Sequence, residues 1–238
     1  MRRAATAAAV VVLLAGCGSD DGPLADVQRS LEDVRAGTMF LELGATTEGA
    51  DPVGFGVEGS FDLDAGGEVP ELDLRYTRLL AGDEEVVRVR SDGQTVTVEE
   101  DGQTSEVPPS RVGALRLEDG PAGFDDFDLE AWIRDPVTEE DGGTTTVTGD
   151  LVVPRMLQDL SRIAAETAGV GAGDGLSGDD ADALADRIRS SSITVVAEGD
   201  RFRSLDAQVA FGREVPAGLR RALGPYAGAA LRLRLRLD

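Results

Sequence analysis

The feature that most constrains this fold is an alternation of apolar and polar side chains with a period of two, which recurs along most of the chain. In residues 53–64 apolar side chains occupy most odd positions, and acidic or small polar ones most even positions. In residues 231–237 leucine alternates with arginine at every position. Because successive side chains of a strand point to opposite faces, this pattern predicts strands with one buried and one solvated face.

Nine segments show this alternation or an imperfect form of it, and we predict each as a strand. They are residues 39–47, 53–64, 71–80, 85–90, 94–99, 144–153, 192–198, 201–212 and 231–237. Turn sequences such as Asp92-Gly93 and Asp101-Gly102 separate several of them. A two-residue Asp-Gly turn tolerates positive φ and matches the twist of paired strands, so consecutive strands should form antiparallel hairpins.

A period near 3.6 residues replaces the alternation in a few places, where we predict helices. These helices are residues 23–36, a short turn from Asp128 through Trp132, residues 154–169 and residues 177–188. The lone Trp132 is interpreted as a packing anchor in preference to a platform for a ligand. Residues 170–178 are rich in glycine and lack the Lys-Ser/Thr pair of a phosphate-binding loop, so they are predicted to be a flexible connector.

The first 22 residues show neither the alternation of a strand nor the apolar spacing of a helix in the folded domain. Two arginines precede an apolar run over residues 4–14 that is too short to span a bilayer and is typical of a signal peptide. The run ends in Leu14-Ala15-Gly16-Cys17, which resembles the lipobox of bacterial lipoproteins, and Cys17 is the single cysteine. A secreted protein with a coincidental cysteine is the alternative.

The lipobox resemblance implies three parts of the chain. Residues 1–16 would be a signal peptide that is removed, and residues 17–22 an acylated flexible tether. Residues 23–238 would form a single lipoprotein domain. Cys17 would carry a diacylglyceryl group and an acylated amino terminus, with chains such as palmitate. Two or three acyl chains are enough for stable attachment to a membrane, whereas one chain alone gives marginal binding.

The composition excludes most catalytic chemistries. The chain has no histidine, no lysine and one cysteine, so it lacks the groups for a Ser-His dyad, a disulfide, a Schiff base or a zinc site of the usual ligands. We therefore expect no enzyme, no cofactor and no metal site. A glycosidase-like carboxylate pair stays open in principle, although no pair stands apart from the acidic surface. The net charge of −22 disfavours nucleic acid as a partner.

The order of the predicted elements resembles the LolA-like half-barrel of bacterial lipid-carrying lipoproteins. Among these it is similar to the LppX/LprG-type (LppX_LprAFG) cell-envelope lipoproteins of actinobacteria. The residues that carry the resemblance are the lipobox, the helix after it, the strand Val147-Thr148-Gly149-Asp150-Leu151 before the helix pair, and the closing Leu-Arg alternation. The resemblance implies an α+β fold, in which a curled antiparallel sheet of about nine strands wraps around three or four helices and leaves an apolar cavity.

On this resemblance we expect a lipoprotein anchored at the extracytoplasmic face of the cell membrane. It would bind, and in the stronger form transfer, a lipid or glycolipid of the cell envelope. The residues expected to line the ligand are apolar positions of the sheet and of the helix after it. They are Phe55, Val57, Phe61, Leu63, Leu72, Leu74, Leu151, Leu157 and Phe211. The alternative is a structural or adaptor lipoprotein with a packed core and an envelope protein as its partner.

The arginines of the closing alternation, Arg232, Arg234 and Arg236, lie on one face of their strand. We interpret this row as pairing across strands with acidic neighbours such as Asp206. Recognition of an anionic lipid headgroup by the same row is the second interpretation.

Overall fold

The computed structural model describes residues 22–67, 69–80, 82–108, 127–167, 186–212 and 229–238. The predicted signal peptide, Cys17 and most of the tether lie outside the described residues, as do the predicted glycine-rich connector and most of the helix after it. The elements are α1 (Pro23–Glu32), β1 (Ala36–Thr46), β2 (Val53–Asp62), β3 (Glu71–Leu80), β4 (Asp83–Asp92), β5 (Val96–Glu100), β6 (Gln103–Val107), α3 (Leu129–Trp132), β7 (Ile133–Asp141), β8 (Thr144–Leu151), α4 (Val153–Thr167), β9 (Ile188–Glu198), β10 (Arg201–Phe211) and β11 (Ala230–Leu237).

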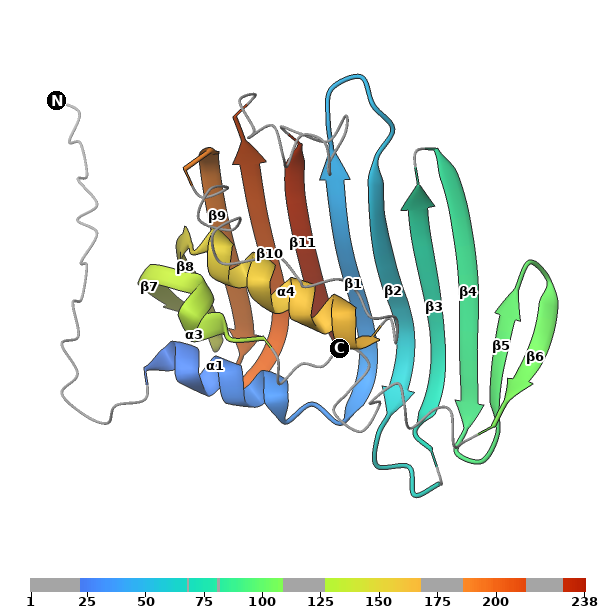
Figure 1. The fold of residues 1–238 in the computed structure, drawn as a ribbon. Coiled ribbons are helices and arrows are strands. Elements are labelled where there is room, and N and C mark those ends of the chain that lie inside the picture. The colour runs from blue at the N-terminus through green and yellow to red at the C-terminus, as the bar shows by residue number, and fades with distance from the viewer. Residues whose placement is uncertain (1–21, 68, 81, 109–126, 168–185, 213–228) are drawn as a thin grey trace, which may run out of the picture.

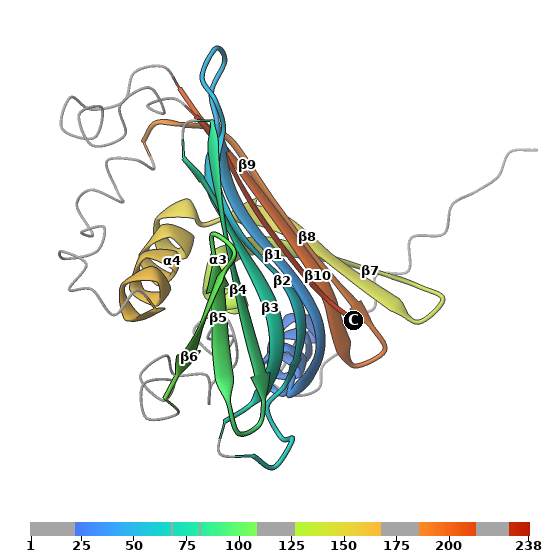
Figure 2. The same ribbon diagram turned by 90° about the vertical axis from the view of Figure 1, so that its right-hand side faces the viewer.

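One antiparallel sheet of eleven strands contains every described strand, in the order β6-β5-β4-β3-β2-β1-β11-β10-β9-β8-β7. The pairing of β1 with β11 joins the two ends of the domain, with Met39 opposite Leu237 and Thr46 opposite Ala230. The sheet is strongly curled, and the three described helices lie on the same side of it (Figures 1 and 2). This side is called the inner face below. The predicted curled antiparallel sheet with helices against one face is confirmed.

The helices cover the sheet unevenly. Figure 1 shows α1, α3 and α4 in front of β7–β11 and β1, whereas β3–β6 extend away to the right. We call β7–β11 together with β1 the covered half, and β2–β6 the wing. The backbone of α1 packs against β10 and α3, and α3 against α4 and β7.

Two of the eleven strands were not predicted. Strand β6 is a polar edge strand in which only Val107 is partly buried, so its sequence shows no alternation. Strand β7 contains Pro136 and is exposed along nearly its whole length, with an irregularity in its pairing between Arg134 and Val137. Proline has no N–H to donate, so it is tolerated at a sheet edge or a bulge.

Two predicted boundaries also move. Helix α1 ends at Glu32, four residues before its predicted end. The Asp33 N–H donates to the Arg29 carbonyl oxygen at 2.9 Å, which is the last i→i−4 bond, and the Val34 N–H then donates to the Leu31 carbonyl oxygen at 3.3 Å in a tighter turn. Ile188 was predicted as helical but begins strand β9, where it lies opposite Phe211. The apolar side chain of Ile188 packs against the core in either assignment, so spacing alone did not distinguish the two.

Helices α1 and α3 are joined by one glutamine. The amide of Gln28 donates to the Phe127 carbonyl oxygen at 2.6 Å, and its side-chain oxygen accepts from the Leu129 N–H at 2.9 Å. The Asp128 carboxylate caps α3 by accepting from the Ala131 N–H at 3.0 Å, as predicted for this helix. These bonds satisfy backbone groups at the start of α3, a four-residue helix that is too short to be stable on its own.

Trp132 joins α3 to α4 and is fully buried, which confirms that it is a packing anchor. Its indole N–H donates to the carboxylate of Asp159 at 2.8 Å, and its ring meets Phe127 edge-on at 5.3 Å. Asp159 is itself buried, and its carboxylate also forms an ion pair with Arg155, whose Nε lies 3.2 Å from Oδ2. A buried carboxylate is costly unless it is paired and hydrogen-bonded, and here it has both partners.

Candidate ligand-binding face

The inner face of the wing is organised in rows of side chains that lie in register across β2, β3 and β4. The lower row is Gly59, Leu74 and Val89, the middle row is Val57, Tyr76 and Val87, and the upper row is Phe55, Arg78 and Glu85. Directly opposite residues of antiparallel strands project from the same face, so each row is a contiguous line of side chains.

Burial falls from the lower row to the upper row. Leu74 is fully buried and Val57 is 5% exposed, but Phe55 is 40% exposed. Tyr76 and Val89 are partly buried and pack against the core cluster. The inner face therefore passes from a closed core to an open apolar surface along the length of its strands.

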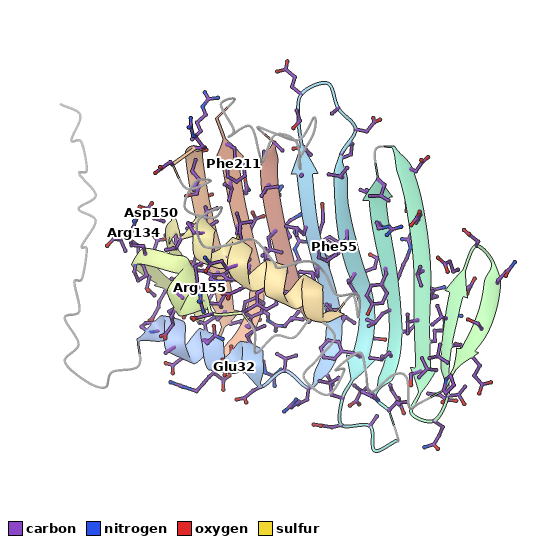
Figure 3. The ribbon with its side chains drawn as sticks, in the orientation of Figure 1. Glu32, Phe55, Arg134, Asp150, Arg155 and Phe211 are labelled. Atoms are coloured by element: carbon purple, nitrogen blue, oxygen red, sulfur yellow. The ribbon has the colours of Figure 1, made fainter. Side chains whose placement is uncertain are left out.

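Other half-buried apolar side chains continue this surface toward the covered half. Leu43 lies opposite Phe55, and Leu231 and Phe211 lie on β11 and β10; all three are only partly buried. Figure 3 shows Phe55 on β2 and Phe211 toward the end of β10. We call Leu43, Phe55, Tyr76, Phe211 and Leu231 the apolar band. Large exposed apolar patches on folded domains are typical of binding sites, so the apolar band is the candidate site of this domain.

The nine residues predicted to line a ligand fall into two groups. Val57, Phe61, Leu72, Leu74 and Leu151 are buried in the core. Leu63, Leu157 and Phe211 are partly buried, and Phe55 is exposed. The structure thus places four of the nine where a ligand could reach them from outside, and the lining role of all nine stays a prediction.

Three members of the apolar band were not predicted to line a ligand: Leu43, Tyr76 and Leu231. Each belongs to a predicted strand, and its place in the alternation puts it on the same face as the buried residues of that strand. Parity indicates which face a side chain is on, but it does not indicate how far along the strand the helices cover that face.

Three hollows lined by described residues lie elsewhere on the molecule. One of about 480 Å³ lies between the end of α1 and the β9–β10 turn and is lined by polar groups including Arg35, Arg201 and Arg203. Hollows of about 530 Å³, with Arg232 and Arg234, and about 610 Å³ lie on the outer face of the covered half and of the wing. None of these three is the apolar cavity that the resemblance implies.

The arginine row of β11 is on the outer face, and two of its three members, Arg232 and Arg234, are paired with acids. Arg232 donates to Asp206 on β10, with Nε at 3.2 Å, and Arg234 donates to Glu42 on β1. Partial burial acts to raise the pKa of Asp206, but hydrogen bonds from Arg232 and Gln208 outweigh it and hold that pKa below 3.8. The predicted pairing with Asp206 is confirmed for Arg232, whereas the Arg236 guanidinium lies 5.9 Å from the centroid of the Phe40 ring.

Within the described parts of the chain, no group of three or more histidine, cysteine, aspartate or glutamate side chains is arranged to hold a metal ion. Among the same residues, no helix has both the length and the apolar character needed to cross a membrane.

No family model matches this chain, and no curated protein matches it in sequence. A search of solved structures finds a similarity to the crystal structure of LprF from Mycobacterium bovis. The two align over 90% of this chain and 89% of that chain, with a TM-score of 0.43 and 10% sequence identity.

Proposed function

We propose that this protein is a membrane-anchored lipoprotein of the LppX/LprG type that binds the acyl chains of an envelope lipid against the inner face of its sheet. The observation that carries the proposal is the fall in burial along that face, from Leu74, fully buried, to Phe55, 40% exposed. The protein would hold its ligand without covalent chemistry, since the chain has no histidine, no lysine and one cysteine.

The hydrophobic effect favours an acyl chain that covers the half-buried apolar band. Each methylene that leaves water contributes about 0.8 kcal/mol, so an acyl chain of a dozen or more carbons laid on this surface would gain several kcal/mol even when half of it stays exposed. The band gains as well, because Phe55 and its neighbours lose contact with water. Ligand and fold should therefore stabilise each other.

The location rests on the amino-terminal sequence. An acyl anchor on Cys17 would attach the domain to the extracytoplasmic face of the cell membrane, where envelope lipids are available. The net charge of −22 works against attraction to anionic headgroups, so the anchor would keep the domain at the membrane. Transfer of the bound lipid to an acceptor membrane or envelope protein is the further step of this proposal.

The test is the lipid carried by the full chain with Cys17→Ala, purified from a bacterial host and analysed by native mass spectrometry. Phe55→Asp should reduce the co-purified lipid at least several-fold, because a carboxylate would be placed in the middle of the apolar band. The matched control is Val137→Asp. Val137 is 57% exposed and lies opposite Thr148 on the outer side of β7, so its replacement should leave bound lipid unchanged.

Both variants should unfold within a few degrees of the parent, since substitutions of exposed side chains usually change stability by less than about 0.5 kcal/mol. Equal lipid content in the Phe55→Asp and Val137→Asp proteins would contradict binding at the apolar band.

The adaptor interpretation is favoured by a different observation. Five of the nine predicted lining residues, including Leu74 and Leu151, are closed in the core, as they would be in a domain that holds no ligand. Absence of any lipid from the native mass spectrum of the parent protein would support the adaptor. An envelope protein would then be the partner, and the apolar band its docking surface.

A further inference from the structure

The hollow of about 530 Å³ on the outer face of the covered half has a floor of small side chains. Four of them lie directly opposite one another across four neighbouring strands (Figure 1): Ser190 on β9, Ala210 on β10, Ala230 on β11 and Thr46 on β1. Adjacent strands are about 4.8 Å apart, so this row spans about 14 Å. Its centre carries two methyl groups, and each of its ends carries a hydroxyl.

The wall beside this floor is made of longer polar side chains. In the next row of the same face, Arg232 and Gln208 lie opposite each other. Both donate to the carboxylate of Asp206, Arg232 with Nε at 3.2 Å and Gln208 with its amide nitrogen at 3.0 Å. Because the ends of both side chains are held at Asp206, they leave the two alanines of the floor uncovered.

The charges along the wall cancel. Arg232 forms an ion pair with Asp206, and Arg234, which also lines the hollow, forms one with Glu42. An anion would meet guanidinium groups that are already neutralised, and the net charge of −22 would repel it at longer range. The hollow therefore suits an uncharged ligand that can both donate and accept hydrogen bonds.

A sugar ring has this combination of groups. Its C–H face is apolar, and each hydroxyl both donates and accepts hydrogen bonds. The methyl groups of Ala210 and Ala230 would lie under the ring face. The ring hydroxyls would then reach Gln208, Arg232 and the exposed Ser190. We propose that this hollow binds sugar units of a neutral polysaccharide.

The polysaccharide would be a separate molecule from the lipid of the proposed function. The hollow and the apolar band lie on opposite faces of the sheet. The four strands of the hollow are interior strands, with β8 and β7 on one side and β2–β6 on the other. A head group joined to acyl chains on the inner face would have to pass around an edge of the sheet to reach the hollow. Sugar binding at this face therefore does not depend on lipid binding at the other.

The test uses the full chain with Cys17→Ala and five probes. Four are neutral tetrasaccharides that differ in linkage or sugar: maltotetraose, isomaltotetraose, cellotetraose and xylotetraose. The fifth is inorganic phosphate. Binding is followed by NMR chemical-shift titration of the backbone amides. At least one tetrasaccharide should shift the amides of residues 208–210 and 230–232, and phosphate at the same concentration should not.

Two variants and a matched control locate the binding. Ala210→Leu should weaken tetrasaccharide binding about tenfold or more, because the larger side chain occupies the place of the ring. Gln208→Ala should weaken it about two- to tenfold, which is the range of one net hydrogen bond. The control is Ser204→Leu, which adds the same side chain to the same face of β10, opposite Arg236 and outside the hollow. It should leave binding unchanged.

Each outcome decides the proposal. If no tetrasaccharide shifts these amides, or if Ala210→Leu and Ser204→Leu bind equally, the hollow does not bind sugar. Shifts with phosphate alone would make it an anion site. If Ala210→Leu proves unstable, Gln208→Ala gives the same test. Lipid content by native mass spectrometry should be equal in Ala210→Leu and its parent, and a joint loss of lipid and sugar would show that the sugar is the head group of the bound lipid.

Discussion

The covered half and the wing belong to one continuous sheet, yet different interactions stabilise them. In the covered half three helices close the inner face, and Trp132, Val147 and Val195 have no exposed surface. In the wing Tyr76 stays partly exposed and Phe55 is 40% exposed, although Val57 and Leu74 beside them are buried. Both halves therefore share one core, and in the wing that core gives way to partly exposed apolar side chains at Tyr76 and Phe55.

The outer faces of both halves carry ion pairs between neighbouring strands. The outer face of the wing carries a network of ion pairs: Arg75 contacts Glu58 at 3.0 Å and Glu84 at 3.4 Å, and Asp73 contacts both Arg88 and Arg90. Exposed pairs of this kind contribute between about 0 and 1 kcal/mol each. They hold neighbouring strands in register but do not replace a closed core, so we expect the wing to open at lower free energy than the covered half.

The largest effect should come from the covered half. Trp132→Ala removes a fully buried indole and should lower the free energy of unfolding by about 3–5 kcal/mol, measured by denaturant titration. Trp132→Phe should cost less, because it keeps most of the packing and loses mainly the hydrogen bond to Asp159. If Trp132→Ala lowered the free energy of unfolding by less than about 1 kcal/mol, the packing of the helices would contribute little to the stability of the covered half.

The corresponding substitution in the wing is Gly59→Ala, which would place a methyl group against the backbone of β3. Gly59 on β2 has φ of +142°, and a Cβ built there would lie 1.9 Å from the Asp73 carbonyl oxygen of β3. Gly59→Ala should therefore destabilise the protein by about 1–3 kcal/mol and separate β2 from β3 locally. Hydrogen exchange should rise in the wing and stay low in β9 and β10.

The control for this variant is Gly56→Ala on the same strand. A Cβ at Gly56 would meet the Leu41 carbonyl oxygen at 3.6 Å, which is an ordinary contact. Gly56→Ala should leave exchange in the wing unchanged. If Gly59→Ala instead raised exchange equally in both halves, the sheet would open as one unit, and the wing would be no easier to open than the covered half.

The smallest effect concerns the outer ion pairs, one in each half. The hydrogen bonds from Arg232 and Gln208 favour the charged form of Asp206, so its pKa is lower in the folded protein than in the unfolded chain. Its contribution is therefore complete above about pH 4 and is lost as pH falls through the lowered pKa. Asp206→Asn should cost less than about 1 kcal/mol at pH 7, and the difference from the parent should shrink below pH 4.

Asp73→Asn is the counterpart in the wing, since Asp73 faces Arg88 and Arg90. At pH 7 both variants should be destabilised by similar small amounts in denaturant titrations. A much larger loss for Asp73→Asn would show that the ion-pair network, and not the ladder of backbone hydrogen bonds, holds the wing together.

The strand pattern was largely predictable because the period of two records which face of a strand is buried. Residues 231–237 were predicted as a strand with arginines on one face, and β11 places those arginines outward beside Asp206. The Asp101-Gly102 turn also follows from local chemistry, since both residues have positive φ, of 51° and 74°. The edge strands β6 and β7 were missed because strands with one neighbour and little burial carry no alternation.

The sequence by itself determined that the chain forms amphipathic strands with polar turns, and that it lacks the side chains for most catalytic chemistries. Only the tertiary structure decided how far the helices reach across the inner face. Leu74 and Phe55 lie on the same face of neighbouring strands, yet Leu74 is fully buried and Phe55 is 40% exposed. Burial at that level depends on contacts between segments far apart in the chain, and a local pattern of apolar residues contains no information about which of them a helix will cover.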